Sequence, residues 1–413
     1  MNITIKNVRL IKNGSVEVGD IYISGDKIVA EEIPSAEVID GKGKFATRGL
    51  VNAHTHAAMT LLRSLADDKD LMSWLKEDIW PIEACMRRED IKAGTALAAV
   101  EMIRGGTTAF ADMYGPCMEE VAKVVEESGL RGALSRGLIG IADGEKKLAE
   151  NVELYKNYQG ACNGRITIML GPHAIYTCPP SYLKKVAMAA QKLGAEIHMH
   201  MNETEVEIAD CLKTYGKRPF EVVADTGLLD CGMLAAHCVH LSDAEIAIMK
   251  AKKVRVAHNP TSNLKLASGI APVTRLLAEG ITVAIGTDGA ASNNNLDMLE
   301  EMRLAALLAK VESKNATALP AKQALEMATT QGACAVGLEV GTKADLVLWD
   351  MSGVEWQPSN NPLSLLVYAA NSSSADTVIV DGQILMEKRE LKTLDEEKIV
   401  AEFNASVKRL TVK

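Results

Sequence analysis

Aromatic side chains are scarce in this sequence. Phe, Trp and Tyr together make up 4% of the 413 residues, although hydrophobic residues as a whole reach 47%. A large core must therefore be filled by aliphatic residues and by the 18 methionines, whose unbranched side chains fit irregular spaces. The charged fraction of 24% is ordinary for a soluble globular protein. The length allows one large domain and a small one.

Runs of basic residues are also missing. No stretch of Lys and Arg forms a stripe, and the formal net charge is -9. A chain of this kind lacks the positive surface that neutralises phosphates, so we expect no nucleic acid partner.

The sequence has neither a long apolar run nor a cysteine pair of the CxxC kind. No apolar stretch is long enough to span a bilayer, so we expect no membrane partner. The first residues, MNITIKNVRLIKNG, alternate like a strand and lack the apolar core of a signal peptide. The eight cysteines are scattered. These features predict a cytoplasmic protein with reduced thiols.

Nucleotide-binding loops are absent as well. No GxGxxG or GxxxxGK[ST] follows a predicted strand, which disfavours a doubly wound open sheet, the competing α/β fold. Short apolar strands alternate with helical segments instead, and we predict a (β/α)8 barrel over residues 49–339. The eight candidate strands are LVNAHTH, TTAFADM, GALSRGL, ITIMLGPHA, EIHMHMNE, MLAAHCV, RVAHNP and TVAIGTDG.

Two β-rich segments flank the predicted barrel. Residues 1–48 read as short strands joined by turns, and residues 340–413 contain ADLVLWD and DTVIVDGQILMEKREL, followed by an amphipathic helix. Neither segment is large enough to fold comfortably alone. We therefore predict that they pair in space as one small β-sandwich.

Histidines gather where the predicted strands end. Of the eight histidines, all but one lie in or at the end of a predicted strand, and acidic residues follow two of these strands. Catalytic residues of such barrels sit at the carboxyl ends of the strands. The candidates are His54, His56, His173, His198, His200, Glu203, His237, His258 and Asp288.

The first strand ends in two histidines. His54 and His56 project from the same face of the strand, while Thr55 points to the other face. Two neutral imidazoles that converge at a strand end suit a divalent metal. The alternative is a pair of hydrogen-bonded histidines, one packed and one in contact with water.

Some of these candidates have a structural interpretation. His198 lies deeper in its strand than His200, and we expect it to pack behind the site. His258 is better read as structural. Asp288 can hydrogen-bond the turn at Gly289, yet the end of the eighth strand adjoins the first, where His54 and His56 begin a site.

The predicted chemistry is hydrolysis assisted by a metal ion. Two histidines of one strand, a third histidine and an aspartate can hold Zn²⁺ or a similar ion, which lowers the pKa of a water molecule towards neutral. Glu203 can favour the start of a helix, but Glu205 and Glu207 can fill that role. Glu203 is therefore available to move protons. The residues alone do not name the bond that is cleaved.

Several of these segments resemble the amidohydrolase superfamily. The resemblance is carried by VNAHTH, HMHMNE, AAHCVH, HNPTSN and IGTDG, together with GTKADLVLWD in the flanking β-rich region. Within the superfamily, HTHAAMTLLRS, WLKEDIWPIE, GGTTAFADMY and GPHAIYT are similar to the 5-methylthioadenosine/S-adenosylhomocysteine deaminases. The resemblance spans almost the whole chain.

The resemblance implies a metal site and three catalytic residues. His54, His56, His200 and Asp288 would hold one Zn²⁺ per subunit, with Fe²⁺ or Mn²⁺ as alternatives. Glu203 would carry a proton to the ring nitrogen and the leaving ammonia, and His237 would polarise the attacking water. Asp288 would help to take the proton of that water.

The resemblance also implies a substrate and its contacts. The expected reaction is hydrolytic deamination of methylthioadenosine, S-adenosylhomocysteine, adenosine or 5′-deoxyadenosine to the inosine analogue. Glu83 would accept the ribose hydroxyls, His173 would contact the nucleoside and Arg136 would face its 5′ side. Trp74 is either a wall of the pocket or a core residue. The family also suggests a homodimer or homotetramer.

One departure from the family pattern bears on the substrate. Some members have a second arginine downstream of the Arg136 position, whereas IADGEKKLAEN offers only Lys146 and Lys147. This difference weakens the case for S-adenosylhomocysteine. Two other interpretations remain open: a hydrolase of guanine, a triazine or a pterin on the same scaffold, and a barrel without metal that only binds or assembles.

Overall fold

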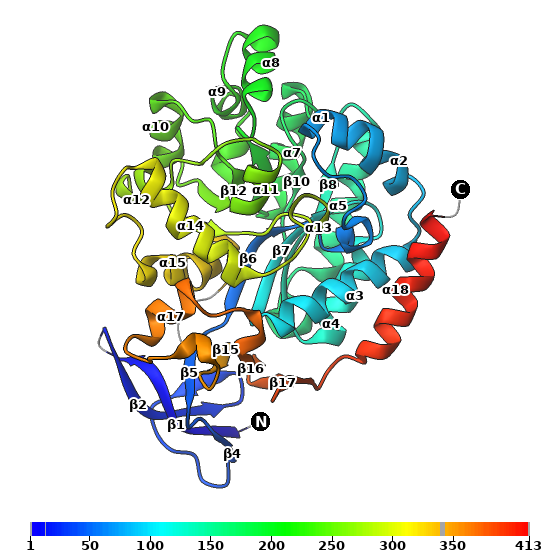
Figure 1. The fold of residues 1–413 in the computed structure, drawn as a ribbon. Helices are drawn as coiled ribbons and strands as arrows, with labels where there is room; N and C mark the ends of the chain where they lie inside the picture. The colour runs from blue at the N-terminus through cyan, green and yellow to red at the C-terminus, as the bar shows by residue number, and fades with distance from the viewer. Residues whose placement is uncertain (1, 13, 339–342, 412–413) are drawn as a thin grey trace.

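The fold is described from a computed structural model for residues 2–12, 14–338 and 343–411 (Figure 1). A nine-stranded sheet lies at one end of the molecule, and two parallel sheets with their helices form the larger body. The predicted boundary between residues 339 and 340 lies outside the described residues.

The nine-stranded sheet joins the two ends of the chain. Its strand order is β18-β17-β16-β15-β5-β1-β2-β3, and β4 pairs with β1. The strands are β1 (Asn2–Lys12), β2 (Ser15–Ser24), β3 (Lys27–Val29), β4 (Glu37–Asp40), β5 (Lys44–Arg48), β15 (Leu346–Asp350), β16 (Ala375–Val380), β17 (Gln383–Glu387) and β18 (Glu390–Leu391). β5 pairs antiparallel with β15, with Phe45 opposite Trp349. The predicted pairing of the two segments is confirmed, while their arrangement as a two-layered sandwich stays a prediction.

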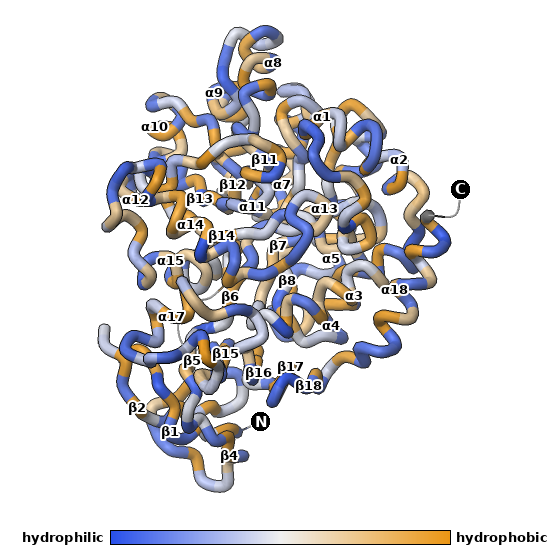
Figure 2. Tube along the Cα trace, in the orientation of Figure 1, coloured by the Kyte–Doolittle hydropathy of each residue, from blue (hydrophilic) through white to orange (hydrophobic). Residues whose placement is uncertain are grey.

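This sheet has its own apolar core. Ile3, Ile5 and Ile23 of the N-terminal segment pack with Leu348 and Ile379 of the C-terminal segment, and all five are fully buried. Hydrophobic and hydrophilic residues alternate in colour along β1 and β2 (Figure 2). Such alternation is typical of a sheet with one covered face.

Two parallel sheets carry the predicted strands of the larger region. One has the order β10-β8-β7-β6, with β9 paired to β8, and the other has the order β11-β12-β13-β14. The strands are β6 (Leu50–Thr55), β7 (Thr107–Tyr114), β8 (Arg131–Leu138), β9 (Ile166–Ile168), β10 (Gly171–Pro172), β11 (Ile197–Met201), β12 (Met233–His237), β13 (Arg255–His258) and β14 (Val283–Ile285). The fourth predicted strand is therefore interrupted at residues 169 and 170.

Hydrogen bonds connect the two parallel sheets on both sides. The amide of Leu170 donates to the carbonyl of Glu196 at 2.8 Å, and that of His198 donates to the carbonyl of Leu170 at 3.0 Å. On the other side, the amide of Asp288 donates to the carbonyl of His54 at 2.9 Å. The carboxyl ends of strands from both sheets therefore meet around one region.

Helices cover the parallel sheets. They are α1 (Leu71–Trp74), α2 (Trp80–Glu83), α3 (Arg88–Arg104), α4 (Met118–Ser128), α5 (Gly144–Tyr158), α6 (Ala161–Gly164), α7 (Pro180–Leu193), α8 (Glu205–Tyr215), α9 (Pro219–Ala224), α10 (Asp243–Ala251), α11 (Pro260–Lys265), α12 (Val273–Ala278), α13 (Ala290–Asn293), α14 (Met298–Glu312), α15 (Ala321–Ala328), α16 (Thr330–Ala335), α17 (Pro362–Tyr368) and α18 (Glu396–Thr411). Shorter helical turns are η1 (Ala57–Leu62), η2 (Leu75–Ile79), η3 (Leu228–Cys231), η4 (Val354–Trp356) and η5 (Ser372–Ser374). Within the described ranges, none of the helices combines the length and the apolar character needed to cross a bilayer.

The C-terminal helix returns to the larger body. α18 lies beside α3 (Figure 1). The guanidinium of Arg104 pairs with Glu396 at the start of α18, and Arg409 near its end pairs with the buried Asp90. The predicted amphipathic helix is confirmed.

Candidate active site

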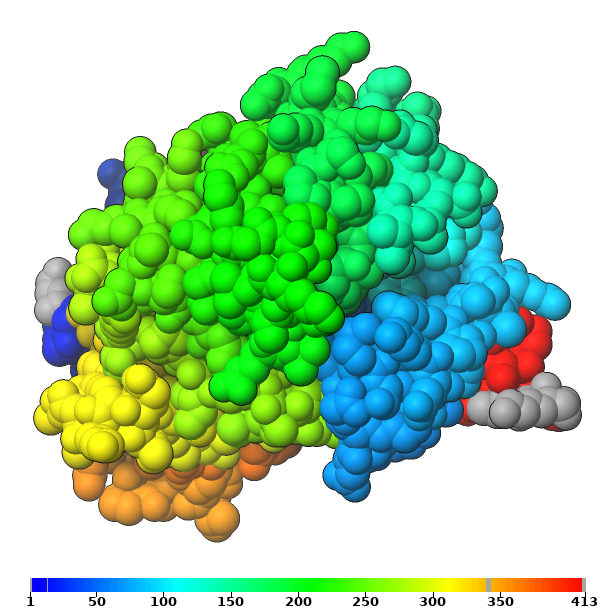
Figure 3. Space-filling view, turned by 90° about the horizontal axis from the view of Figure 1, so that it is seen from above, coloured from blue at the N-terminus to red at the C-terminus, as the bar shows by residue number. Residues whose placement is uncertain are grey.

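A pocket opens where the strands of the two parallel sheets end. Figure 3 shows a recess between the light-blue surface of the α1–α2 segment and the teal to green surface beside it. Polar residues from α2 and from the ends of several strands line the pocket: His56, Glu83, Arg136, His173, His200, Glu203, His237 and Asp288. Large apolar and aromatic residues complete its wall: Met59, Leu71, Trp74, Leu75, Trp80, Met113, Tyr114, Ile139, Tyr176 and Leu266.

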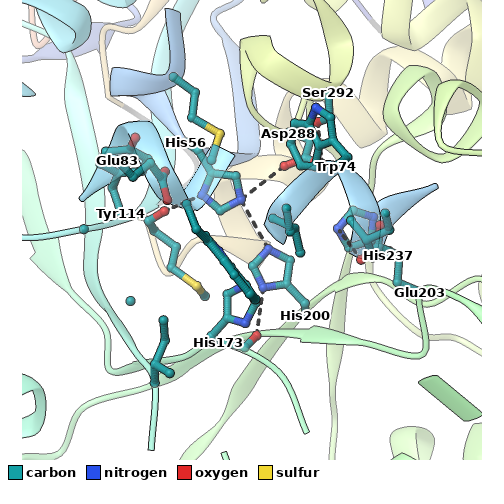
Figure 4. A pocket seen from close by; sticks show the side chains of 18 of the residues that line it. His56, Trp74, Glu83, Tyr114, His173, His200, Glu203, His237, Asp288 and Ser292 are labelled. Carbon is teal, nitrogen blue, oxygen red and sulfur yellow. Dashed lines mark hydrogen bonds and ion pairs between the residues drawn. The ribbon is translucent and has the colours of Figure 1, made fainter. Parts of the chain in front are cut away.

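Three histidines and one aspartate converge at the base of this pocket. His54 lies in β6 and His56 directly follows it, His200 lies in β11, and Asp288 follows β14. Nε2 of His56 lies 3.2 Å from Oδ1 of Asp288 and 3.3 Å from Nε2 of His200 (Figure 4). Nε2 of His54 lies 3.4 Å from the same Oδ1. The structure therefore brings together the four residues that the sequence and the family resemblance nominate.

The Nδ1 atoms of these histidines are held by groups behind the site, so their Nε2 atoms face one another and Asp288. Nδ1 of His200 donates to the carbonyl of His173 at 2.8 Å, and Nδ1 of His56 donates to the carbonyl of Met113. Nδ1 of His54 lies 2.8 Å from Nε2 of His198, and its buried Nε2 has no hydrogen bond. An imidazole whose Nδ1–H is held in this way presents the Nε2 lone pair to a metal. Three such nitrogens with one carboxylate fit a zinc-like ion.

The charges around Asp288 also fit a cation. Burial opposes protonation of His56, but the hydrogen bond and charge of Asp288 outweigh burial and raise the pKa of His56 to about 9. Burial also works against ionisation of Asp288, yet His54 and His56 hold its pKa well below the ordinary value. The space between these groups therefore favours positive charge, which a divalent ion supplies.

Two serines hold the far side of Asp288. Oδ2 accepts hydrogen bonds from Ser262 at 2.6 Å and Ser292 at 3.0 Å, and Oδ1 accepts one from the amide of Gly289 at 2.8 Å. Asp288 has a φ of 63°, in the left-handed region that a non-glycine residue seldom adopts. Both sequence interpretations hold, because Asp288 binds its own turn and also faces the histidines. Such strained residues cluster at functional sites.

Glu203 and His237 lie next to the four converging residues. Oε2 of Glu203 is 3.9 Å from Nε2 of His237, and both side chains are almost fully buried. Nδ1 of His237 is 2.8 Å from Oδ1 of Asn263, so it donates there and leaves Nε2 as an acceptor. Burial raises the pKa of Glu203. The pair can therefore accept and pass on protons inside the pocket.

The helix after Glu203 does not use this carboxylate. Thr204 caps α8 by accepting the amide of Glu207, and Glu207 accepts the amide of Glu203 at 2.7 Å. The expectation that Glu203 is available for chemistry agrees with this arrangement.

The residues predicted to contact substrate share the same pocket. Glu83 ends α2, and burial raises its pKa against the opposing hydrogen bond from Tyr114. His173 follows β10, its Nδ1 lies 3.0 Å from Oγ1 of Thr177, and burial lowers its pKa to about 3. His173 is therefore a neutral imidazole. Trp74 is buried and lines the pocket, so it serves both as wall and as core.

Tyr114 was missed by the sequence analysis. It ends β7, is buried and hydrogen-bonds Glu83 from inside the pocket. The rule that located the histidines, namely a polar side chain at the end of a strand, would also have found this residue. Glu150, which binds Arg136, was missed because it belongs to helix α5 rather than to a strand end.

Two of the candidate histidines, His198 and His258, have structural positions. His198 lies behind His54 as expected, and His258 is buried with its pKa lowered by burial to about 3. Neither lines the pocket.

Comparison with known families identifies the scaffold. Residues 45–385 match the model of the amidohydrolase family. The chain belongs to the amidohydrolase family. This amidohydrolase is 51% identical to a 5-methylthioadenosine/S-adenosylhomocysteine deaminase of Pelotomaculum thermopropionicum, over 96% of this chain and 95% of the relative.

Two solved structures are similar to this amidohydrolase along nearly their whole length. An adenosine deaminase of Xanthomonas campestris with bound zinc is 36% identical, with a TM-score of 0.93 over 99% of this chain and 98% of that one. The zinc complex of atrazine chlorohydrolase from Arthrobacter aurescens is 26% identical, with a TM-score of 0.90 over 98% and 100% of the chains.

Proposed function

We propose that this amidohydrolase removes ammonia from adenosine-type nucleosides by metal-dependent hydrolysis, giving the inosine analogue. One observation carries the proposal: three imidazoles and a carboxylate converge beside the buried Glu203–His237 pair, with Glu83 in the same pocket. The similarity to the deaminase of Pelotomaculum thermopropionicum over almost the whole chain supports the choice of substrate.

We assign the metal to His54, His56, His200 and Asp288. A bound Zn²⁺ would supply Lewis acidity that lowers the pKa of a water molecule towards neutral, and Fe²⁺ or Mn²⁺ can use the same ligands. The free Nε2 of His54 and the fixed tautomers of His56 and His200 support this assignment.

Three side chains then move the protons of the water. Asp288 and Glu203 act as bases, and His237 orients the water by accepting a hydrogen bond at Nε2. Attack at the amine-bearing ring carbon forms a carbon–oxygen bond and opens the double bond to the adjacent ring nitrogen, and the bond to the exocyclic amine then breaks. Glu203 delivers one proton to the adjacent ring nitrogen and one to the departing amine. Both protons come from the water, so the products are the inosine analogue and ammonia.

Glu83, His173 and Arg136 are proposed to hold the nucleoside. An ionised Glu83 accepts hydroxyl donors in pairs, which suits a ribose diol. Neutral His173 can donate or accept one hydrogen bond to the nucleoside. Arg136 lies opposite Tyr114 on the neighbouring strand of the sheet, and Tyr114 hydrogen-bonds Glu83, so that the three residues line the same part of the pocket. We therefore place the 5′ group near Arg136.

The larger architecture is part of the proposal. We infer that the two parallel sheets form one (β/α)8 barrel over residues 49–339, and that residues 1–48 and 340–413 fold as a β-sandwich. The hydrogen bonds that connect the parallel sheets support the barrel. The homo-oligomeric state and the cytoplasmic location stay predictions from the sequence.

The direct test is ammonia release by the zinc-loaded protein. The substrates to compare are methylthioadenosine, S-adenosylhomocysteine, adenosine, 5′-deoxyadenosine, adenine and guanine. We expect turnover of the nucleosides and not of the free bases. Because the fold is also similar to a triazine-converting enzyme, a chlorinated triazine and a pterin belong in the panel. Turnover of guanine, the triazine or the pterin alone would replace the proposed substrate class.

A further inference from the structure

Arg136 is the one Lys or Arg side chain among the described residues that line the pocket. It lies on β8, next to the last residues of that strand, and its side chain is only 10% exposed. A buried guanidinium in a substrate pocket attracts anionic groups, provided that its charge is not already compensated.

Glu150 compensates this charge. Nε of Arg136 donates to Oε2 of Glu150 at 3.0 Å, and Nη1 donates to the carbonyl of Gly137 at 2.7 Å. Nη2 makes no hydrogen bond with the part of the chain that is described. The guanidinium therefore keeps one nitrogen for a substrate, but its charge is shared with a carboxylate of the protein.

Glu150 is outside the lining of the pocket. It belongs to α5, its side chain is 38% exposed, and its other oxygen lies 4.0 Å from Nζ of the exposed Lys146. Lys147 is also nearby, with Nζ bound to the carbonyl of Ala142 at 2.7 Å. Glu150 thus reaches Arg136 from outside the lining of the pocket.

We propose that Glu150 determines substrate specificity by holding Arg136, so that the pocket disfavours nucleosides with an anionic 5′ substituent. Neutral substituents, such as a methylthio group, are favoured over carboxylates. A substrate carboxylate at Arg136 must share the guanidinium with Glu150 and lies near its negative charge. This inference rests on the proposed deaminase function and on the placement of the 5′ group near Arg136.

The test compares two substrates that differ only in charge, adenosine 5′-carboxylate and adenosine 5′-carboxamide. For the zinc-loaded Glu150→Gln variant, we expect the ratio of kcat/KM for carboxylate over carboxamide to rise about tenfold relative to the unaltered protein. The kcat/KM for methylthioadenosine should change less than about twofold. S-adenosylhomocysteine, whose carboxylate is further from the ribose, should gain in the same direction.

A matched control is available on the same helix. Glu153→Gln removes a charge from α5 at a residue that contacts Asn157 and Lys156 rather than Arg136, and should leave the ratio unchanged. In an Arg136→Gln background, Glu150→Gln should lose its effect, because the interaction acts through Arg136. A merely structural role of Glu150 would not depend on Arg136.

The possible failures can be told apart. An unchanged ratio in Glu150→Gln, with normal turnover of methylthioadenosine, overturns the role of Glu150 and leaves the deaminase function standing. A raised ratio that persists in the Arg136→Gln background also overturns it. Absence of turnover with every nucleoside, in the unaltered protein, contradicts the proposed function and this inference together.

Discussion

At the scale of single residues, each imidazole of the proposed metal site has its tautomer set by the atom behind it. His56 and His200 donate to backbone carbonyls, whereas His54 relies on the side chain of His198. A carbonyl cannot be removed by substitution, but His198 can. It is therefore the point at which the orientation of the metal ligands can be tested.

We expect His198→Leu to weaken zinc binding about 10- to 100-fold, because Nδ1 of His54 loses its partner. His198→Gln, which retains an acceptor, should bind zinc more tightly than the leucine variant. Competition with a chromophoric chelator measures both affinities. Equal zinc affinity in the leucine variant and the unaltered protein would remove His198 from this role.

Glu203 is predicted to carry protons without holding the metal. Glu203→Gln should keep zinc at the unaltered stoichiometry and lower kcat at least about 100-fold, because the amide cannot accept and release the proton. Glu205→Gln, an exposed residue of the same segment, is the control. Metal analysis measures the zinc content of the variant, and steady-state kinetics measure its kcat. An active Glu203→Gln variant contradicts the mechanism.

Glu83 tests the ribose contact. Replacement of Glu83 by alanine should raise KM for methylthioadenosine about tenfold or more, because the paired hydrogen bonds to the diol are lost. A 2′,3′-dideoxy nucleoside lacks these hydroxyls, so its kcat/KM should change far less. If both substrates lose equally, Glu83 does not bind the ribose.

At the scale of elements, the loops after the strands carry the site in strained conformations. Asn202, His237 and Asp288 follow or end three different strands, and all have φ between 52° and 72°. The strand-end rule located His237 and Asp288 in the sequence, but not Asn202. It could not reveal their backbone conformation, because glycine usually marks a positive φ and none of the three is glycine.

A buried glutamate ties the segment after β13 to the loop after β14. Glu301 in α14 accepts the amide of Thr261 at 3.0 Å and the side-chain amide of Asn293 at 2.7 Å. Ser262, next to Thr261, and Ser292, next to Asn293, both donate hydrogen bonds to Asp288. Burial raises the pKa of Glu301 to about 8.

This shift predicts a pH dependence of stability. A glutamate with a raised pKa binds its proton more tightly in the folded than in the unfolded protein. The free energy of unfolding should therefore fall as pH rises from the ordinary glutamate pKa towards 8, by up to about 1.4 kcal/mol per pH unit from this group. Urea unfolding across this range measures the slope. Glu301→Gln should flatten it and Glu300→Gln should not, and identical slopes contradict the assignment.

At the scale of the whole molecule, the sequence predicted the strands better than their assembly. The predicted strands agree with β6 to β14, because apolar runs between helical segments are a local signal. The interruption of the fourth strand at residues 169 and 170 is a tertiary effect, since Leu170 pairs with β11 across the junction of the two sheets. No local pattern encodes that pairing.

The residues of the candidate site likewise fall into those that the sequence located and those that it did not. His54, His56, His200 and Asp288 could be found from the sequence because each lies near or just after the carboxyl end of a strand, and the carboxyl ends of neighbouring parallel strands converge. Glu83 and Arg136 needed the family resemblance, and Glu150 needed the structure. The contact of Glu150 with Arg136 depends on how α5 packs beside β8, which residue spacing does not determine.

The measurement that tests the central claim most directly is a zinc titration of metal-free protein with methylthioadenosine as substrate. The account predicts no turnover without metal, and release of ammonia and methylthioinosine that rises linearly and saturates at one zinc per chain. Full activity of the metal-free protein, or no activity with one zinc bound, would contradict the claim that these four residues build a metal-dependent nucleoside deaminase.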